Sequence, residues 1–159
     1  MAVPLVEAEA GASVRSARVT RGVARLFVSL GHAVLREVPL PDGRRADLLA
    51  LGPEERFTIV EVKSCERDFL TDGKWQDYRA FCDHLVFAVD PAFPLDLLPE
   101  TVGLVVADGY GGALVRSAPC HPLAPARRRA LLARFARLAA RRVEGLIDPA
   151  GVARRPTED

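Results

Sequence analysis

The spacing of apolar residues divides the chain into helical and extended segments. Between residues 13 and 30, apolar side chains recur every three or four positions, which predicts an amphipathic helix with Ser13 as its N-cap and Gly31 as its stop. The same period over residues 125–143 predicts a last helix that begins at Pro125. A shorter helix is predicted over residues 72–82, with Thr71 as its cap. The apolar stripe of the first helix consists of Val19, Val23, Leu26, Phe27 and Leu30.

Short runs of β-branched and apolar residues separate these helices and predict six strands. Turn residues such as Pro41-Asp42-Gly43 bound them. The order is helix, three-strand meander, helix, strand, hairpin and helix. It predicts an α/β fold in which helices flank a mixed central sheet, with a β-hairpin and a C-terminal helix added. The predicted strands cover residues 33–40, 45–51, 57–64, 84–89, 102–107 and 113–116.

Length and composition favour a single globular domain. A chain of 159 residues is of ordinary domain size, and we assign the domain to residues 13–143, with flexible tails over 1–12 and 147–159. No apolar run approaches the roughly 20 residues of a membrane span, so we expect no membrane segment. The three cysteines are an odd number at irregular spacing, which is typical of free thiols in a reducing cytoplasm.

The net charge of +1 conceals an uneven distribution along the chain. Residues 11–36 contain five arginines and no acid, and residues 120–143 contain seven arginines and no acid. Fifteen acids and seven bases lie between them, over residues 37–111. The two basic segments either decorate solvent-exposed helix faces or contact the phosphates of DNA. The arginines that we assign to DNA contact are Arg15, Arg18, Arg127, Arg134, Arg137 and Arg141.

One strand, over residues 57–64, carries charged groups that do not fit a buried position. Glu61 and Lys63 are two residues apart, so their side chains lie on the same face of the sheet. Asp47 lies on the preceding strand, and the short turn between the strands brings it near the register of Glu61. Burial of these charges costs free energy unless they are paired or bound to a metal. We therefore expect two acids and one lysine to share the wall of a cleft.

This set of side chains suits metal-dependent phosphodiester hydrolysis. Mg²⁺, or Mn²⁺, prefers oxygen ligands, and Asp47, Glu61 and the carbonyl of Val62 would supply them. Lys63 would lie beside the attacking water or the phosphate and stabilise developing charge. It is one of only two lysines among 22 basic residues, which favours a specific role. The structural alternative is an ion pair between Glu61 and Lys63 at a solvated sheet edge.

Five further residues are candidates for accessory roles, and three of them have a structural alternative. Glu37 is either a further acid of the site or part of a surface salt bridge. Trp75 and Tyr78 either pack against the sheet or shape the wall of the site and stack on a base. Ser64 directly follows the strand of Glu61, and Lys74 is the second lysine of the chain.

Several strings along the chain carry a resemblance to a known family. The pattern of Asp47 on one strand and Glu61-Val62-Lys63 on the next resembles the PD-(D/E)XK nuclease superfamily, although no proline precedes Asp47. Longer strings resemble the MmcB family of bacterial DNA-repair proteins. They are Arg45-Ala46-Asp47, Glu61-Val62-Lys63-Ser64, Asp68-Phe69, Lys74-Trp75, Tyr78, Cys82-Asp83, Phe87-Ala88-Val89, the segment 103–108 and the segment 123–128.

The resemblance implies a restriction-endonuclease-like core, a role in DNA repair and a divalent metal at Asp47 and Glu61, with Lys63 catalytic. Two functions are then open. The first is a metal-dependent DNA nuclease. The second is a catalytically silent DNA-binding or adaptor subunit that works through Trp75, Tyr78 and the arginine-rich helices. DNA, repair proteins and a second copy of the chain are the expected partners, and a cytoplasmic, nucleoid-associated location is expected.

Overall fold

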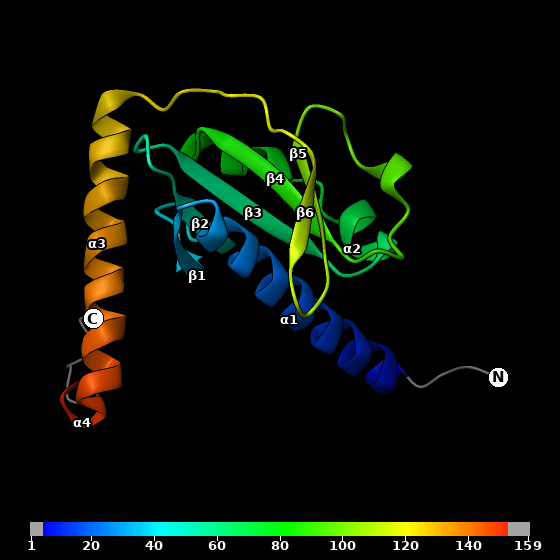
Figure 1. The fold of residues 1–159 in the computed structure, drawn as a ribbon, viewed down its shortest axis with the longest axis horizontal. Coiled ribbons are helices and arrows are strands. Elements are labelled where there is room, and N and C mark those ends of the chain that lie inside the picture. Colours follow the sequence, from blue (N-terminus) through cyan, green and yellow to red (C-terminus); the bar gives the residue numbers. More distant parts are fainter. Residues whose placement is uncertain (1–4, 153–159) are drawn as a thin grey trace. The chain divides into compact units, whose positions relative to one another are not determined.

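The computed structural model describes the backbone of residues 5–152 and the side chains of residues 11–151. The chain divides into two compact units, Met1–Pro122 and Leu123–Asp159, and the predicted domain over residues 13–143 spans parts of both. The first contains the sheet and most of the expected elements, whereas the second contains the C-terminal helix (Figure 1).

The first unit has the predicted order of elements. A helix precedes a three-strand meander, which is followed by short helices, a fourth strand and a hairpin, so the mixed α/β class is confirmed (Figure 1). The elements are α1 (Leu5–Ser29), β1 (Ala33–Pro39), β2 (Arg45–Leu51), β3 (Phe57–Lys63), α2 (Glu66–Thr71), the 3-10 helix η1 (Trp75–Phe81), β4 (His84–Val89), the 3-10 helix η2 (Leu95–Leu97), β5 (Gly103–Ala107) and β6 (Gly112–Arg116).

The six strands form one open sheet in the order β1-β2-β3-β4-β5-β6. The pairs β3–β4 and β4–β5 are parallel, and the other pairs are antiparallel. In the parallel part, Lys63 pairs with Val89 and Val89 pairs with Val106. The carboxyl ends of β3, β4 and β5 therefore lie side by side at one edge of the sheet.

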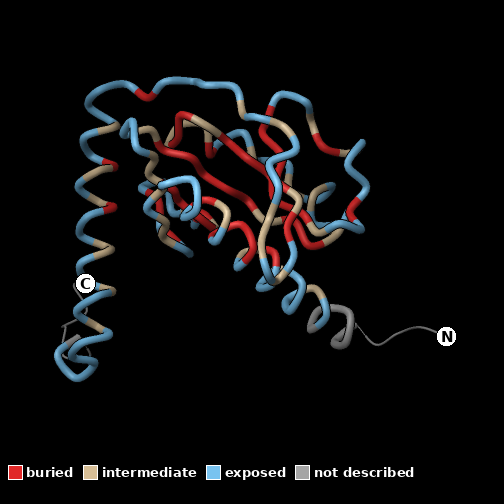
Figure 2. Tube along the Cα trace, in the orientation of Figure 1, coloured by how far each residue is buried: buried red, intermediate tan, exposed pale blue. Residues whose placement is uncertain are grey.

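Helix α1 covers one face of this sheet and buries its apolar stripe there (Figure 1). Val19, Val23 and Phe27 pack with alternate strand residues such as Leu48 and Val60, as expected from the two-residue period of a strand. The buried segments concentrate in the strands and in the face of α1 turned toward them (Figure 2). Leu30 was expected in the stripe but is 51% exposed, because the helix ends one residue earlier.

The first helix begins at Leu5 and not at Ser13, which lies inside it. The prediction of a tail over residues 1–12 is wrong for residues 5–12, whose leucine, alanine and glutamate residues favour a helix. Residues 1–4 lie outside the described part of the chain. The predicted stop is confirmed: Gly31 has φ +83°, and its N–H donates to the carbonyl of Val28 at 3.0 Å.

The helix predicted over residues 72–82 is wrong in its first part. Thr71 is the last residue of α2 and caps no following helix, and the next helical turn, η1, begins at Trp75. Asp72 interrupts the helix because its carboxylate accepts the backbone N–H of Lys74 at 3.3 Å and also reaches Lys63. Gly73 follows it and adds backbone freedom.

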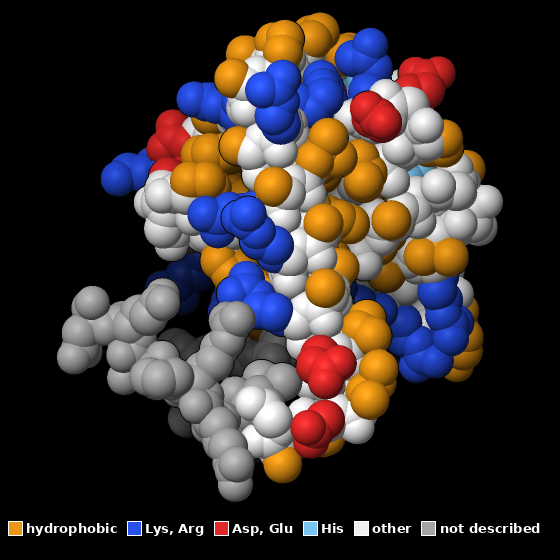
Figure 3. All heavy atoms as spheres, turned by 90° about the vertical axis from the view of Figure 1, so that its left-hand side faces the viewer, with side chains coloured by type: hydrophobic (Ala, Val, Ile, Leu, Met, Phe, Trp, Pro, Cys, Tyr) orange, Lys and Arg blue, Asp and Glu red, His pale blue; other side chains and the backbone are white. Residues whose placement is uncertain are grey.

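The second unit consists of α3 (Pro125–Ile147) and α4 (Pro149–Val152). Helix α3 extends four residues beyond its predicted end at Val143, and α4 occupies residues that were expected to form a tail. Residues 153–159 of that tail lie outside the described residues. On the face shown in Figure 3, basic side chains form separate groups among hydrophobic ones. None of the helices within residues 5–152 has the length and apolar character needed to cross a membrane.

Candidate functional site

Asp47 and Glu61 meet where β2 and β3 separate. The last backbone pair of these strands is Leu48 with Val60, which leaves Asp47 opposite Glu61. Their side chains replace the missing ladder bonds: the N–H of Asp47 donates to Oε1 of Glu61 at 3.3 Å, and the N–H of Val62 donates to Oδ2 of Asp47 at 2.8 Å. Glu61 is only 5% exposed. The expected juxtaposition of the two acids is therefore present.

Lys63 lies two residues beyond Glu61 and is paired with an acid that the sequence analysis did not single out. Its Nζ lies 2.5 Å from Oδ2 of Asp72, and the two side chains are 9% and 24% exposed. The Lys63 ammonium also lies 5.9 Å from the centre of the Phe87 ring. The sequence predicts Asp72 at the start of a helix. The one signal for a partner of Lys63 is that a lysine in a buried strand requires an acid nearby.

The two carboxyl groups are held closer to their neutral forms than exposed acids would be. Burial, and then the neighbouring Asp47, raise the pKa of Glu61 to about 8. Burial is also the main cause that raises the pKa of Asp47. The pKa of Tyr78 is raised as well, by burial first and then by Glu61 and Asp47. Acidic groups thus dominate this site, and the hydroxyl of Tyr78 lies within their field.

Glu37 lies on β1 opposite Asp47, between the paired residues Arg36 and Val38. Its φ of +51° is unusual for a residue other than glycine, and its carboxylate accepts from Nε of Arg45 at 2.5 Å. This salt bridge agrees with the structural alternative for Glu37. A hollow of about 420 Å³ is nevertheless lined by Glu37, Asp47 and Val62 together with residues of α1.

The other accessory candidates each contact a different neighbour. Tyr78 is 8% exposed, and its hydroxyl donates to the carbonyl of Arg45 at 3.2 Å. Trp75 packs edge to face on Phe87 at 5.4 Å, which agrees with a packing role. The hydroxyl of Ser64 donates to the carboxylate of Asp68. Lys74 contacts Asp72 through its backbone N–H.

The arginines assigned to DNA contact fall in both units. Arg15 on α1 reaches the end of β3: its Nη1 donates to the carbonyl of Ser64 at 3.3 Å, and its Nε lies 3.4 Å from Asp90. Arg18 lies one turn further along α1, near Asp108. The remaining four lie on α3 in the second unit. They are Arg127, Arg134, Arg137 and Arg141.

Comparison with known proteins gives the chain its family. A family model described as DNA repair protein MmcB-like matches residues 4–150. The chain belongs to the MmcB-like family of DNA repair proteins. A solved structure, the SPO1766 protein of unknown function from Silicibacter pomeroyi, is 41% identical with a TM-score of 0.83, and the match covers 91% of this chain and 97% of that chain. Among curated proteins there is no significant match.

The acids of this MmcB-like protein suit a hard divalent cation that also binds water and phosphate. Asp47 and Glu61 provide two neighbouring carboxylates, and Asp72 is a third acid withdrawn from water, whereas Lys63 supplies one ammonium. A divalent charge would offset this excess. Within the described residues, no group of three or more histidine, cysteine or acidic side chains is arranged to hold a metal by itself. The donor set therefore fits Mg²⁺ or Mn²⁺, which commonly use one or two protein carboxylates.

Proposed function

We propose that this MmcB-like protein is a metal-dependent nuclease of the PD-(D/E)XK type, which hydrolyses phosphodiester bonds of DNA during repair. One observation carries the proposal. The buried carboxylate of Glu61 and the half-buried carboxylate of Asp47 lie on adjacent strands at the point where the strands separate, and Lys63 follows Glu61 on the same strand and face. Neighbouring carboxylates withdrawn from water reduce stability unless something offsets their charge. Such an arrangement is typical of a functional site.

Each residue of the site would have a separate role in hydrolysis. Asp47 and Glu61 would hold the cation, with the carbonyl of Val62 as a third oxygen. A bound Mg²⁺ supplies a water of lowered pKa and neutralises charge on the phosphate. The Val62 N–H fixes the Asp47 carboxylate by its 2.8 Å hydrogen bond, so this ligand is held in place before the substrate arrives.

Lys63 would stabilise the charge that develops on the phosphate oxygens. Its Nζ lies 2.5 Å from Oδ2 of Asp72, which fixes the position of the ammonium. The ammonium has three N–H donors, so a hydrogen bond to Asp72 leaves donors for a phosphate oxygen. Asp72 therefore acts as a positioning residue for Lys63.

Cleavage of labelled DNA with Mg²⁺ or Mn²⁺ tests the proposal. We expect cleavage by the wild type, and its loss in Lys63→Ala and Asp47→Asn. We also expect Mn²⁺ to raise the melting temperature of the wild type but not of Asp47→Asn, because only the folded acids bind the ion. Asp77→Asn is the matched control: it removes an acid that pairs with Arg44 on the surface, and it should leave both readouts unchanged.

An adaptor subunit that binds DNA without cutting it is the second candidate. The closed pair of Lys63 with Asp72 favours it, since the ammonium already has a partner without substrate. DNA binding measured in EDTA for the same variants separates the two functions. Binding by the wild type, with no cleavage in either metal and no metal-induced rise in melting temperature, would replace the nuclease by the adaptor.

A further inference from the structure

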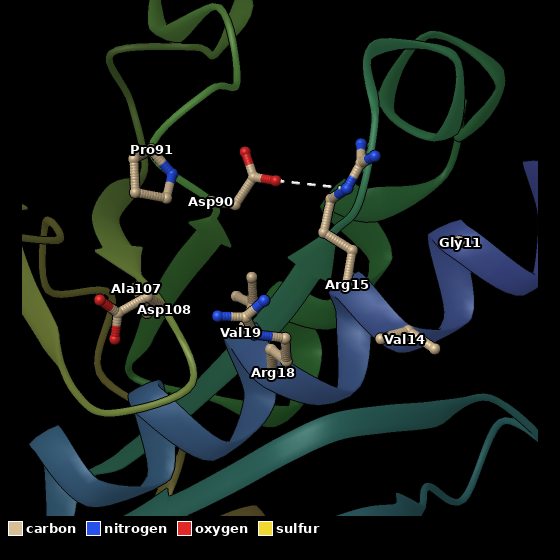
Figure 4. Close-up of a pocket in the computed structure, with 9 residues that line it drawn as sticks. All are labelled: Gly11, Val14, Arg15, Arg18, Val19, Asp90, Pro91, Ala107 and Asp108. Carbon is tan, nitrogen blue, oxygen red and sulfur yellow. Dashed lines mark ion pairs between the residues drawn. The ribbon is translucent and has the colours of Figure 1, made fainter.

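A cavity of about 390 Å³ opens beside the carboxyl ends of β4 and β5 (Figure 4). Asp90 and Asp108 enter it from the ends of these strands, and Arg15 and Arg18 rise toward them from α1. Apolar side chains, among them Val19, complete the wall. The cavity thus combines guanidinium groups with an apolar surface, the two features that single-stranded nucleic acids require of a binding site.

The strand register places this cavity at the same end of the sheet as the acidic site. Lys63, Val89 and Val106 lie side by side, so their strands end at a common edge. Glu61 and Lys63 lie on the face opposite α1, because Val60 and Val62 alternate with them and pack toward α1. Two strand spacings separate the end of β3 from that of β5, or roughly 10 Å. Arg15 bridges the first of them, because it contacts Ser64 after β3 and Asp90 after β4. A length of roughly 10 Å corresponds to about three stacked nucleotides.

The two acids orient the arginines and leave them able to bind an anion. Arg15 uses Nε toward Asp90 and Nη1 toward Ser64, and a guanidinium carries five N–H groups. Asp108 is occupied mainly by its own turn: its Oδ1 accepts the N–H groups of Tyr110 at 2.8 Å and Gly111 at 3.0 Å. Arg18 lies beside this turn, since a Cβ built on Gly109 would be 3.2 Å from its Nε.

The same turn presents an aromatic ring to solvent. Tyr110 is 79% exposed, yet its backbone is firmly held. Its N–H donates to Asp108, and Nη1 of Arg25 donates to its carbonyl at 3.0 Å. Helix α1 approaches so closely at Gly22 that a Cβ there would lie 2.1 Å from the carbonyl oxygen of Asp108. An exposed ring on a well-anchored turn is a suitable stacking surface for an unpaired base.

We infer that the substrate DNA carries a single-stranded segment, which passes from the acidic site around the carboxyl ends of the strands to Arg15 and Arg18 and stacks a base on Tyr110. The inference rests on the proposed function for its link to cleavage. A duplex is the poorer occupant, because paired bases are stacked on each other and cannot present a face to Tyr110. The cavity also has room for a nucleotide or two, not for a double helix.

Fluorescence anisotropy in EDTA, where no cleavage occurs, tests the inference. The probes are an oligothymidylate of about eight nucleotides, within the usual site size, and a duplex of equal length. Tyr110→Ala should weaken binding of the single strand at least about fivefold and leave duplex binding unchanged. Tyr110→Phe should keep wild-type affinity, because it keeps the ring. Arg18→Ala should weaken single-strand binding and make it less sensitive to salt.

Leu114→Ala is the control for Tyr110, since it shortens another exposed hydrophobic side chain of the same hairpin. The inference is overturned if the wild type does not bind the single strand, if Tyr110→Ala binds it normally, or if the duplex loses as much affinity. The assay is independent of the metal. Failure of the Mn²⁺ and cleavage experiments would therefore remove the nuclease while single-strand binding stands.

Discussion

Lys63 and Asp72 form the ion pair on which the arrangement of the site depends. The ammonium lies on a buried strand, and Oδ2 of Asp72 lies 2.5 Å from its Nζ. When a buried charge loses its partner, the free-energy cost of removing it from water remains, but the attraction that offset this cost is lost. The pair therefore holds the segment between α2 and η1 against the end of β3.

Asp72→Asn is expected to lower the free energy of unfolding by about 3 kcal/mol, because it leaves a buried ammonium without its counter-charge. Urea denaturation in EDTA measures the change. Asp77→Asn breaks the exposed pair with Arg44 and should cost less than about 1 kcal/mol. Equal effects of the two variants would contradict a special role for Asp72.

Glu61 gives the metal-free protein an unusual dependence of stability on pH. Its pKa rises from an ordinary value of 4.5 to about 8 on folding, so the native state holds more protons than the unfolded state between these values. The free energy of unfolding should then fall as pH rises through this interval. Glu61→Gln should flatten the profile and make the protein more stable than wild type at the alkaline end.

Chemical denaturation across this pH interval, in EDTA, provides the measurement for Glu61→Gln. Glu100→Gln, which changes an exposed acid, should keep the wild-type profile. A wild-type profile that rises with pH in this interval would show that Glu61 is ionised in the metal-free fold.

At the scale of elements, α1 supports both functional regions. One side of the helix buries Val19 and Val23 against the sheet, and the arginines beside that stripe reach the ends of β3 and the β5–β6 turn. Gly22 allows the close approach of the turn, because its missing side chain makes room for the backbone of Asp108 and Gly111. The position of Tyr110 thus depends on one small residue of α1.

Gly22→Ala should destabilise the protein although alanine is the better helix former, because its Cβ would clash with two backbone carbonyl groups at 2.1 and 2.5 Å. Gly11→Ala is the matched control on the same helix: nothing lies within 4 Å of a Cβ there, and stability should rise by about 0.5–1 kcal/mol. Thermal melts of the two variants should therefore shift in opposite directions. A stabilised Gly22→Ala would show that the turn can move away.

At the scale of the whole molecule, the charges that we assign to DNA contact are spread over two units. Arg15 and Arg18 lie in the first unit, and four arginines follow one flank of α3 in the second. Binding through both units would make DNA affinity steeply dependent on salt, since each neutralised phosphate releases counterions. The net charge of +1 alone would not suggest such a steep dependence of DNA affinity on salt.

Arg137→Gln should reduce the slope of log affinity against log salt by about 0.9 on duplex DNA, the value for one phosphate contact. Arg129→Gln makes the same charge change on a different side of α3, because eight residues displace it by about 80° around the helix. It should leave the slope unchanged. Equal slopes for Arg137→Gln and the wild type would mean that this arginine only faces solvent.

The sequence by itself determined the strands and the face on which Asp47, Glu61 and Lys63 lie. These features are local: the two-residue period places Glu61 and Lys63 on one side, and a short turn fixes the register of β2 with β3. The helix stop at Gly31 was equally predictable, because only a left-handed conformation was required there. Two of the family strings, Arg45-Ala46-Asp47 and Glu61-Val62-Lys63-Ser64, lie on β2 and at the end of β3.

Tertiary structure alone decided the partners of these residues. Asp72 lies outside its expected helix, and its carboxylate pairs with the Lys63 ammonium, nine positions earlier. Arg15 meets Ser64 across 49 residues and Arg25 meets Tyr110 across 85. Contacts over such separations depend on how the strands are ordered in the sheet, and no local pattern of residues encodes that order.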